Sequence, residues 1–349
     1  MIGSYLLKIL LENGYKVFVL ARNKEKKSAQ ERVAESLRLW DQSSDYFKND
    51  NLVVINGDVG YSNFNISSEE TIEKMLSQIE IITHVAALTS FTASIAACRK
   101  ANVEGTKNIL DFALRCKRLQ KVNHISTIFV VGNKENIDFS EDVLNVGQGF
   151  NNAYEQSKYE AELVVKDYQA KGIKISIFRP GAVIGDSKEG KTISFNLFYE
   201  PIRFFTKEIF TDFPLNFDSS LNLINVDTVA RAIFLLQNKI ESQVYHIVSP
   251  EDTKMSFLSN FSCSFFGFEM PKFAPVEVFD FRKLSDAQKI LAGPFIPYCN
   301  YKTKFQWARS KQALARYNFA FPKIDEQNLS RIFDFCVQSK YMKKKIKSK

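Results

Sequence analysis

A tyrosine and a lysine, a pair suited to proton transfer at a carbonyl, lie four positions apart at Tyr154 and Lys158. The stretch around them, Phe150 to Glu162, reads as a helix with Asn151 or Asn152 as its N-cap, so both side chains would leave one face. A phenol titrates near ~10 in model peptides, and a neighbouring ammonium lowers that pKa. The pair predicts a proton donor beside its activator, although an exposed aromatic residue beside a solvated lysine would show the same spacing.

The elements that would position this pair follow a regular alternation. Strands that are apolar throughout alternate with helical patterns, which predicts an α/β fold with a doubly wound parallel sheet. Strands are expected at Lys16–Ala21, Leu52–Gly57, within Glu80–Leu88, at Lys121–Ser126 and at Lys174–Pro180. Helices are expected from Ile2 to just before Gly14, which would be the C-cap glycine, after Lys27 to about Leu39, from Ser67 or Ser68 to about Gln78, from Ala93 to Cys116 and from Asn152 to Lys171.

The pattern changes beyond Gly185, where periodicity weakens and Phe, Tyr and Pro become frequent. We therefore expect a dinucleotide-binding domain over 1–186, with returns to it at about 221–250. A smaller substrate lobe would take 187–220 and 251–330, and 331–349 would be a basic tail. Five aromatic residues could line an acyl pocket, although an aromatic stripe is more often core: Phe195, Phe198, Tyr199, Phe204 and Phe205.

Composition narrows the class of protein. With 349 residues, 45% of them hydrophobic, the chain can bury a large core, which excludes general disorder. The five cysteines lack C-x-x-C spacing and the three histidines share no ligand spacing, so we expect reduced thiols, no metal site and a cytoplasmic location. No stretch approaches the ~20 apolar residues of a membrane span. The charge of +8 would suit acidic partners such as nucleotides and thioesters. The lysine-rich end is more often a solvated tail than a membrane anchor, although contact with a membrane surface is possible, and no nucleic-acid partner is expected.

Several ordered motifs resemble the extended short-chain dehydrogenase/reductase superfamily, and within it the thioester reductase and fatty acyl-CoA reductase ("male sterility") group. "NAYEQSKYEAE" is similar to its tyrosine-lysine helix, and "HISTIFVVG" to its Ser/Thr strand. The other matches are "NVEGT" from Asn102, "GDV" from Gly57, "FRPGAVIGDSKEG" and "NLINVDTVARAI". Together these cover nearly the whole chain.

The resemblance implies roles for four residues. Tyr154 would protonate the carbonyl oxygen as hydride arrives, and Lys158 would lower its pKa and hold the nicotinamide ribose. Thr127 would bond the same oxygen, with Ser126 as the weaker candidate. Asn102 would hold the water or the backbone kink of the proton relay. Thr127 and Asn102 could also be ordinary polar residues at a strand end and in a helix.

The charge of the residues just after the second strand of the family pattern indicates which cofactor, NADPH or NADH, is bound. NAD-binding proteins place an acid there, whereas arginine accommodates a 2′-phosphate, and this strand ends in Ala21-Arg22-Asn23. NADPH is therefore favoured over NADH, with Arg22 on the adenine or the phosphate. The resemblance implies further cofactor contacts at Arg32, Asp58, Val59, Ala86, Ala87, Pro180 and Gly181.

One part of the family pattern is missing. The family opens with a strand and a loop of the form T-G-A-T-G-F-I-G, and here only Ile2 and Gly3 correspond to it. Because that strand is central and its loop binds the pyrophosphate, we expect a sheet without its first strand. Two explanations are open: the start is internal to a longer reading frame, or the chain is a decayed copy.

The preferred function is NADPH-dependent reduction of an acyl thioester, on coenzyme A or a carrier protein, to aldehyde or alcohol. The segment "GPFIPYCNYKTKF" from Gly293 resembles a proline-tyrosine segment in the C-terminal lobe of this group. One alternative is a sugar-nucleotide epimerase, dehydratase or other carbonyl reductase, since fold alone does not choose the substrate. Another is a dinucleotide-binding protein without catalysis.

Overall fold

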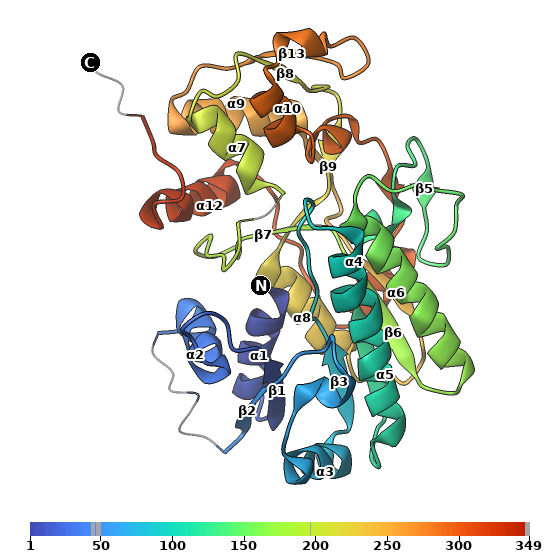
Figure 1. The fold of residues 1–349 in the computed structure, drawn as a ribbon. Helices are drawn as coiled ribbons and strands as arrows, with labels where there is room; N and C mark the ends of the chain where they lie inside the picture. Colours follow the sequence, from blue (N-terminus) through green and yellow to red (C-terminus); the bar gives the residue numbers. More distant parts are fainter. Residues whose placement is uncertain (43–45, 47–49, 196, 346–349) are drawn as a thin grey trace.

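The core of the computed structural model is a parallel sheet with the strand order β11, β6, β4, β3 (Figure 1). The structure describes residues 1–42, 46, 50–195 and 197–345. The sheet comprises β3 (Ile81–His84), β4 (Lys121–Ile125), β6 (Ile175–Pro180) and β11 (Val244–Ile247). Every residue of β4 and β6 is buried, because each has a strand on both sides and helices over both faces. The predicted doubly wound α/β fold is confirmed.

Two layers of helices enclose this sheet. On one face, α5 (Gly105–Arg115) and α6 (Ala153–Ala170) pack Leu110 and Val165 against Val122 of β4, and α3 (Glu69–Gln78) joins α5 in a neighbouring cluster. On the other face, Ile125 of β4 packs with α1 (Ile2–Glu12), α8 (Val226–Leu236) and α11 (Ala308–Ala315). Alternate residues of β4 therefore face opposite layers, as the two-residue period of a strand requires.

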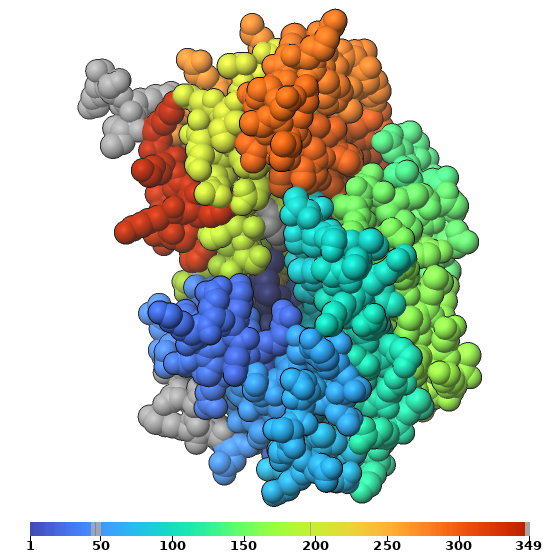
Figure 2. All heavy atoms as spheres, viewed as in Figure 1, coloured from blue at the N-terminus to red at the C-terminus, as the bar shows by residue number. Residues whose placement is uncertain are grey.

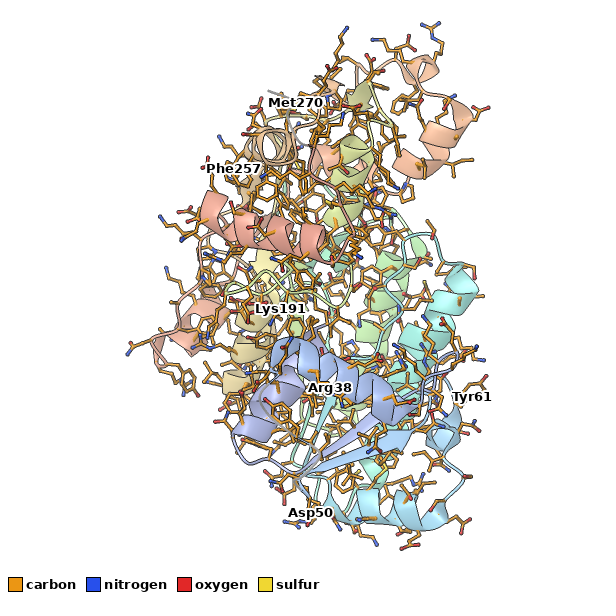
Figure 3. The ribbon with its side chains drawn as sticks, turned by 90° about the vertical axis from the view of Figure 1, so that its left-hand side faces the viewer. Arg38, Asp50, Tyr61, Lys191, Phe257 and Met270 are labelled. Atoms are coloured by element: carbon orange, nitrogen blue, oxygen red, sulfur yellow. The ribbon has the colours of Figure 1, made fainter. Side chains whose placement is uncertain are left out.

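A second, two-stranded sheet lies beside the first. In it β1 (Val17–Ala21) pairs in parallel with β2 (Leu52–Asn56), and α2 (Ala29–Trp40) packs against both. Phe18 of β1 and Ile82 of β3 share one apolar cluster, yet in the described ranges no strand connects β1 to β3 by hydrogen bonds. The sheet is interrupted between β1 and β3, at the position where the sequence predicts a missing strand. Figure 3 looks onto this side, with Arg38 of α2 labelled.

The predicted helix from Ala93 to Cys116 contains an irregular turn. It begins as α4 (Ile95–Cys98), passes through a π-helical turn at Arg99–Glu104 and continues as α5. Ser94 caps its start by accepting a hydrogen bond from the Ala97 amide. A π turn inserts one residue into the helix and shifts the face that follows, and such turns are frequent at functional sites.

A second lobe, rich in Phe and Tyr, sits above the sheet (Figures 1 and 2). Its main helices are α7 (Tyr199–Thr206), α9 (Met255–Phe266), α10 (Asp286–Ala292) and α12 (Glu326–Gln338). Short strands complete it and its junction with the first domain: β5 (Asp138–Phe139), β7 (Ala182–Ile184), β8 (Asp212–Pro214), β9 (Ser220–Leu221), β10 (Leu223–Asn225), β12 (Thr253–Lys254), β13 (Lys272–Ala274) and β14 (Lys304–Phe305). Short 3-10 turns lie at Ser62–Asn65, Ile128–Val131, Phe281–Lys283 and Ile296–Asn300.

The structure agrees with the expected return to the sheet at about 221–250 and differs at the start of the expected tail. The segment from β10 through α8 to β11 returns to the parallel sheet, since β11 pairs with β6. The basic tail expected from residue 331 begins inside α12, whose Phe333 and Cys336 are fully buried. Helix α12 continues there because its apolar residues repeat at helical spacing and face the lobe core. Lys345 also pairs with Glu208, so the described part of that tail is attached to the lobe.

The five aromatic residues considered for an acyl pocket belong to the lobe's apolar core. Tyr199 is fully buried, and its hydroxyl accepts a hydrogen bond from the Gly185 amide. Phe198 and Phe205 pack on other rings. Among the described residues, no helix is long and apolar enough to cross a bilayer. The described residues also contain no group of His, Cys, Asp and Glu arranged to hold a metal ion.

Candidate active site

The carboxyl ends of the parallel strands bring the predicted residues to one edge of the molecule. Thr127 follows β4, Ala86 and Ala87 follow β3, and Pro180 ends β6. Gly3 lies in the first turn of α1, where a Cβ would reach Val85 just beyond β3 at 3.4 Å. In open α/β sheets this edge is where ligands bind. Figure 2 shows the surface hollowed here, between the first residues and the second lobe.

Helix α6 positions the tyrosine and the lysine. Asn152 is the N-cap, and its side-chain oxygen accepts a hydrogen bond from the Glu155 amide. The cap fixes the first turn, which contains Tyr154, and Lys158 follows one turn later on the same face. The sequence predicted either Asn151 or Asn152 as the N-cap, and in the structure it is Asn152.

Tyr154 is half-buried and lies beside Thr127. Burial raises the pKa of the Tyr154 phenol to about 12, while a hydrogen bond with the Thr127 side chain acts in the opposite direction. The phenol is therefore protonated at neutral pH, as a proton donor must be. The sequence prediction that Lys158 lowers this pKa is wrong for the structure described, because burial is the largest influence on the phenol and raises its pKa. The Thr127 oxygen also accepts a hydrogen bond from the Phe129 amide at 3.3 Å, which fixes its orientation. The structure thus brings these two predicted residues together.

Lys158 is almost completely buried. Its ammonium donates to the Ile125 carbonyl at 2.7 Å and lies 3.5 Å from Nε2 of His124. Burial lowers the pKa of Lys158 to about 8, and the charge of Glu162 acts in the opposite direction. The ring of His84 lies 5.5 Å from that of His124, and burial lowers the pKa of both imidazoles. Two neutral rings therefore lie behind the amine.

Asn102 connects the π turn to α6. Its side-chain oxygen accepts from the Leu88 amide at 2.7 Å, and its nitrogen donates to the Leu88 carbonyl at 3.0 Å. The same nitrogen donates to Ser157 at 2.8 Å, and the Ser157 hydroxyl donates to the Tyr154 carbonyl. Asn102 thereby fixes both the loop after β3 and the turn of α6 between Tyr154 and Lys158.

A buried ion pair supports these residues, and sequence reasoning missed it. Arg179 makes two hydrogen bonds to Glu162, at 2.9 and 2.7 Å, and Ser126 donates to the same carboxylate at 2.5 Å. Ser126 precedes Thr127, Glu162 lies one turn beyond Lys158, and Arg179 precedes Pro180. With its hydroxyl engaged here, Ser126 is the weaker candidate for the substrate oxygen.

Two aromatic side chains beside Tyr154 were also missed. Phe91 stacks on Tyr154 with ring centroids 5.9 Å apart, and on its other side Phe91 stacks on Tyr298 at 5.2 Å. Phe91 comes from the loop after β3, and Tyr298 from the second lobe. The only signal for Tyr298 was its place in the proline-tyrosine segment that begins at Gly293.

The residues expected at the adenine end lie on the exposed side of the site. Arg22, after β1, pairs with Asp58, after β2, at 3.3 Å. Arg32 of α2 donates to the Arg22 carbonyl, and the Val59 carbonyl accepts from Asn108 at 2.8 Å. Arg22 remains two-thirds exposed, with its charge available to a ligand.

The residues expected nearer the nicotinamide differ in exposure. Ala86 and Ala87 are exposed, whereas Pro180 and Gly181 are buried. A Cβ on Gly181 would meet the Asn222 side chain at 2.6 Å. Only glycine fits at position 181, because the Asn222 side chain approaches the backbone there too closely for a Cβ atom.

Comparison with known proteins places this arrangement in context. The chain is 28% identical over 250 residues to L-2-aminoadipate reductase of Saccharomyces cerevisiae, an alignment that covers 66% of this chain and 18% of the reductase. It is 26% identical over 147 residues to fatty acyl-CoA reductase 1 of Arabidopsis thaliana, covering 37% and 30% of the two chains. The chain thus spans a minor part of each of these relatives.

A solved structure covers almost the whole fold. The terminal R domain from the myxalamid PKS-NRPS biosynthetic pathway superposes with a TM-score of 0.84 at 23% identity, over 98% of this chain and 89% of that one. The model of an NAD-binding family, described as male sterility protein, matches residues 1–233. The chain belongs to this male sterility protein family.

Proposed function

We propose that this protein reduces an acyl thioester, carried on coenzyme A or on a carrier protein, with NADPH as the reductant. The observation that carries the proposal is the hydrogen bond between Tyr154 and Thr127 just after β4, with Lys158 one turn further along α6 and bonded to the Ile125 carbonyl at the end of the same strand. The named relatives are reductases, which supports the reaction class.

The residues present fit a dinucleotide. Lys158 is buried without a carboxylate within hydrogen-bond distance in the described part of the chain, so its ammonium can bind ribose hydroxyls. Arg22 offers an exposed guanidinium at the opposite end, and Ala86 and Ala87 leave the end of β3 uncovered by large side chains. The Arg22 guanidinium would pair with a 2′-phosphate, which is the basis for preferring NADPH.

In the reduction, bound NADPH would supply the hydride that reaches the thioester carbonyl carbon. Thr127 and Tyr154 would donate hydrogen bonds to the carbonyl oxygen and stabilise its growing negative charge. Tyr154 would then give up its proton, while the Lys158 ammonium stabilises the phenolate. Loss of the thiol leaves an aldehyde, and reduction to the alcohol requires a second NADPH.

Purified protein supplied with NADPH and palmitoyl-coenzyme A, or the same acyl group on a carrier protein, tests the proposal by the fall in nicotinamide absorbance. Tyr154→Phe should lower kcat by about 10³, the size expected for loss of a general acid. Tyr159→Phe is the matched control, because Tyr159 lies on the same helix and packs on Phe150 instead.

Two results would contradict the proposal. Turnover of a UDP-sugar with NAD, without thioester reduction, would indicate an epimerase or dehydratase. Binding of NADPH without turnover of either substrate would indicate a non-catalytic dinucleotide-binding protein.

A further inference from the structure

One tyrosine of the second lobe reaches the first turn of α6. Tyr298 is 2% exposed and lies in the 3-10 turn at Ile296–Asn300. Its hydroxyl donates to Oε1 of Glu155 at 2.5 Å and accepts from the Asn152 side chain at 2.8 Å. Glu155 directly follows Tyr154, and Asn152 is the cap of α6.

Glu155 is the centre of this contact. It is fully buried, and it also accepts from the backbone amide of Asn151 at 2.9 Å. The carboxylate therefore joins the backbone just before α6, the helix itself and the second lobe. A buried carboxylate requires such partners, because an uncompensated charge in an apolar surrounding is costly.

The ring of Tyr298 makes a second link to the reactive phenol. Phe91 lies between Tyr298 and Tyr154, with interplanar angles of 20° and 28°. Phe129, two residues after Thr127, meets Tyr298 edge-on at 5.3 Å. The tyrosine thus reaches Tyr154 by one path through hydrogen bonds and by another through stacked rings.

We propose that Tyr298 is a positioning residue through which the second lobe sets the placement of Tyr154. The contact of the lobe with α6 would hold the phenol at the carbonyl oxygen, whereas the cofactor contacts at β1 and β2 would not depend on it. The role of Tyr298 in turnover rests on the proposed reduction; its role in holding α6 does not.

Tyr298→Phe tests this inference, because it removes the hydroxyl and keeps the ring. Tyr301→Phe is the control, since Tyr301 is buried in the same stretch and stacks on Tyr298 at 6.3 Å, but its hydroxyl makes no hydrogen bond with α6. Four quantities are measured for each variant of the 349-residue chain: amide hydrogen exchange over residues 150–158, kcat and KM for the thioester, and the Kd for NADPH.

Tyr298→Phe should speed exchange over residues 150–158 by about tenfold, in line with the loss of a hydrogen bond to a charged group. It should lower kcat by a similar factor and leave the Kd for NADPH within about twofold. Tyr301→Phe should do neither.

The outcomes separate this inference from the proposed function. If the wild type reduces no thioester, the proposed function fails, and hydrogen exchange alone decides whether Tyr298 holds α6. If the wild type is active, faster exchange with unchanged kcat overturns the positioning role in favour of a purely structural one. Unchanged exchange overturns the route through α6.

Discussion

Two arginine–carboxylate pairs mark the two ends of the candidate site, and they lie in opposite surroundings. Arg179 and Glu162, beneath the tyrosine helix, have side chains 1% and 0% exposed. Arg22 and Asp58, at the adenine end, are 66% and 30% exposed. The first pair makes two short hydrogen bonds and binds Ser126 as well, whereas the second makes a single contact.

The difference in burial suggests different roles: the buried pair holds α6 in place, whereas the exposed pair is accessible to a ligand. At the tyrosine end, hydrogen bonds from β4, β6, the π turn and the second lobe fix α6 before any ligand arrives, and such preorganisation is what a proton donor needs. At the end expected to bind adenine, the Arg22 side chain is mostly exposed and can turn toward a ligand. The interruption of the sheet between β1 and β3 lies beside β1 and β2, the strands that Arg22 and Asp58 follow.

The largest effect is expected from breaking the buried pair. Arg179→Ala would leave Glu162 as a buried carboxylate without its main partner, and removal of one partner typically costs about 3 to 5 kcal/mol of unfolding free energy. Arg22→Ala is the matched control at the exposed pair, with an expected change below about 1 kcal/mol. Urea unfolding followed by circular dichroism measures both, and similar values for the two variants would refute the contrast.

Replacing Lys158 is expected to raise the unfolding free energy, whereas replacing Arg179 lowers it. Because burial lowers its pKa to about 8, the charged form destabilises the folded protein at neutral pH. Lys158→Met should therefore raise the unfolding free energy at pH 7 by about 1 to 3 kcal/mol while abolishing turnover. Thermal unfolding measures the gain.

The gain in unfolding free energy caused by Lys158→Met should decrease as the pH rises. Between pH 8 and the ordinary lysine pKa of about 10.5, the unfolded chain keeps a proton that the folded protein has lost, so the wild type gains stability as the pH rises. The advantage of Lys158→Met should therefore shrink across that interval. An advantage that grows with pH would show that Lys158 is charged and well paired in the folded protein.

A change in cofactor affinity is expected at Arg22. Arg22→Ala should weaken NADPH binding by about tenfold and leave NADH nearly unaffected, because only NADPH carries the 2′-phosphate that the guanidinium can pair with. Fluorescence titration of both nucleotides measures the ratio of the two Kd values. Equal losses would place Arg22 on the adenine ring, and no loss would remove it from the cofactor site.

The sequence allowed prediction of features that depend on nearby residues. The alternation of apolar strands and helices, the cap of α6 and the end of the first helix before Gly14 all follow from local spacing, and the structure confirms them. The proximity of Tyr154 and Thr127 followed from the resemblance, since nothing local relates residues on different elements.

The features that escaped prediction depend on contacts between distant residues. Tyr298 and Glu155 are 143 positions apart, and no periodicity relates them. The pairing of Glu162 with Arg179 was invisible because a charged residue on a helix and one in a strand are each ordinarily exposed. The continuation of α12 past residue 331 was missed because the lysines that follow dominated the composition of that end.

The smallest effect is expected on the exposed side of α6. Glu160 lies two residues after Lys158 but on another face, where it binds Arg99 of the π turn at 2.6 and 2.8 Å. Arg99 is nearly half exposed, so solvent screening should limit the change caused by Glu160→Gln to below about 1 kcal/mol of unfolding free energy. Because the pair lies away from Tyr154, kcat should not change. A several-fold fall in kcat would mean that the solvent-exposed side of α6, as well as the buried frame and the second lobe, places the phenol.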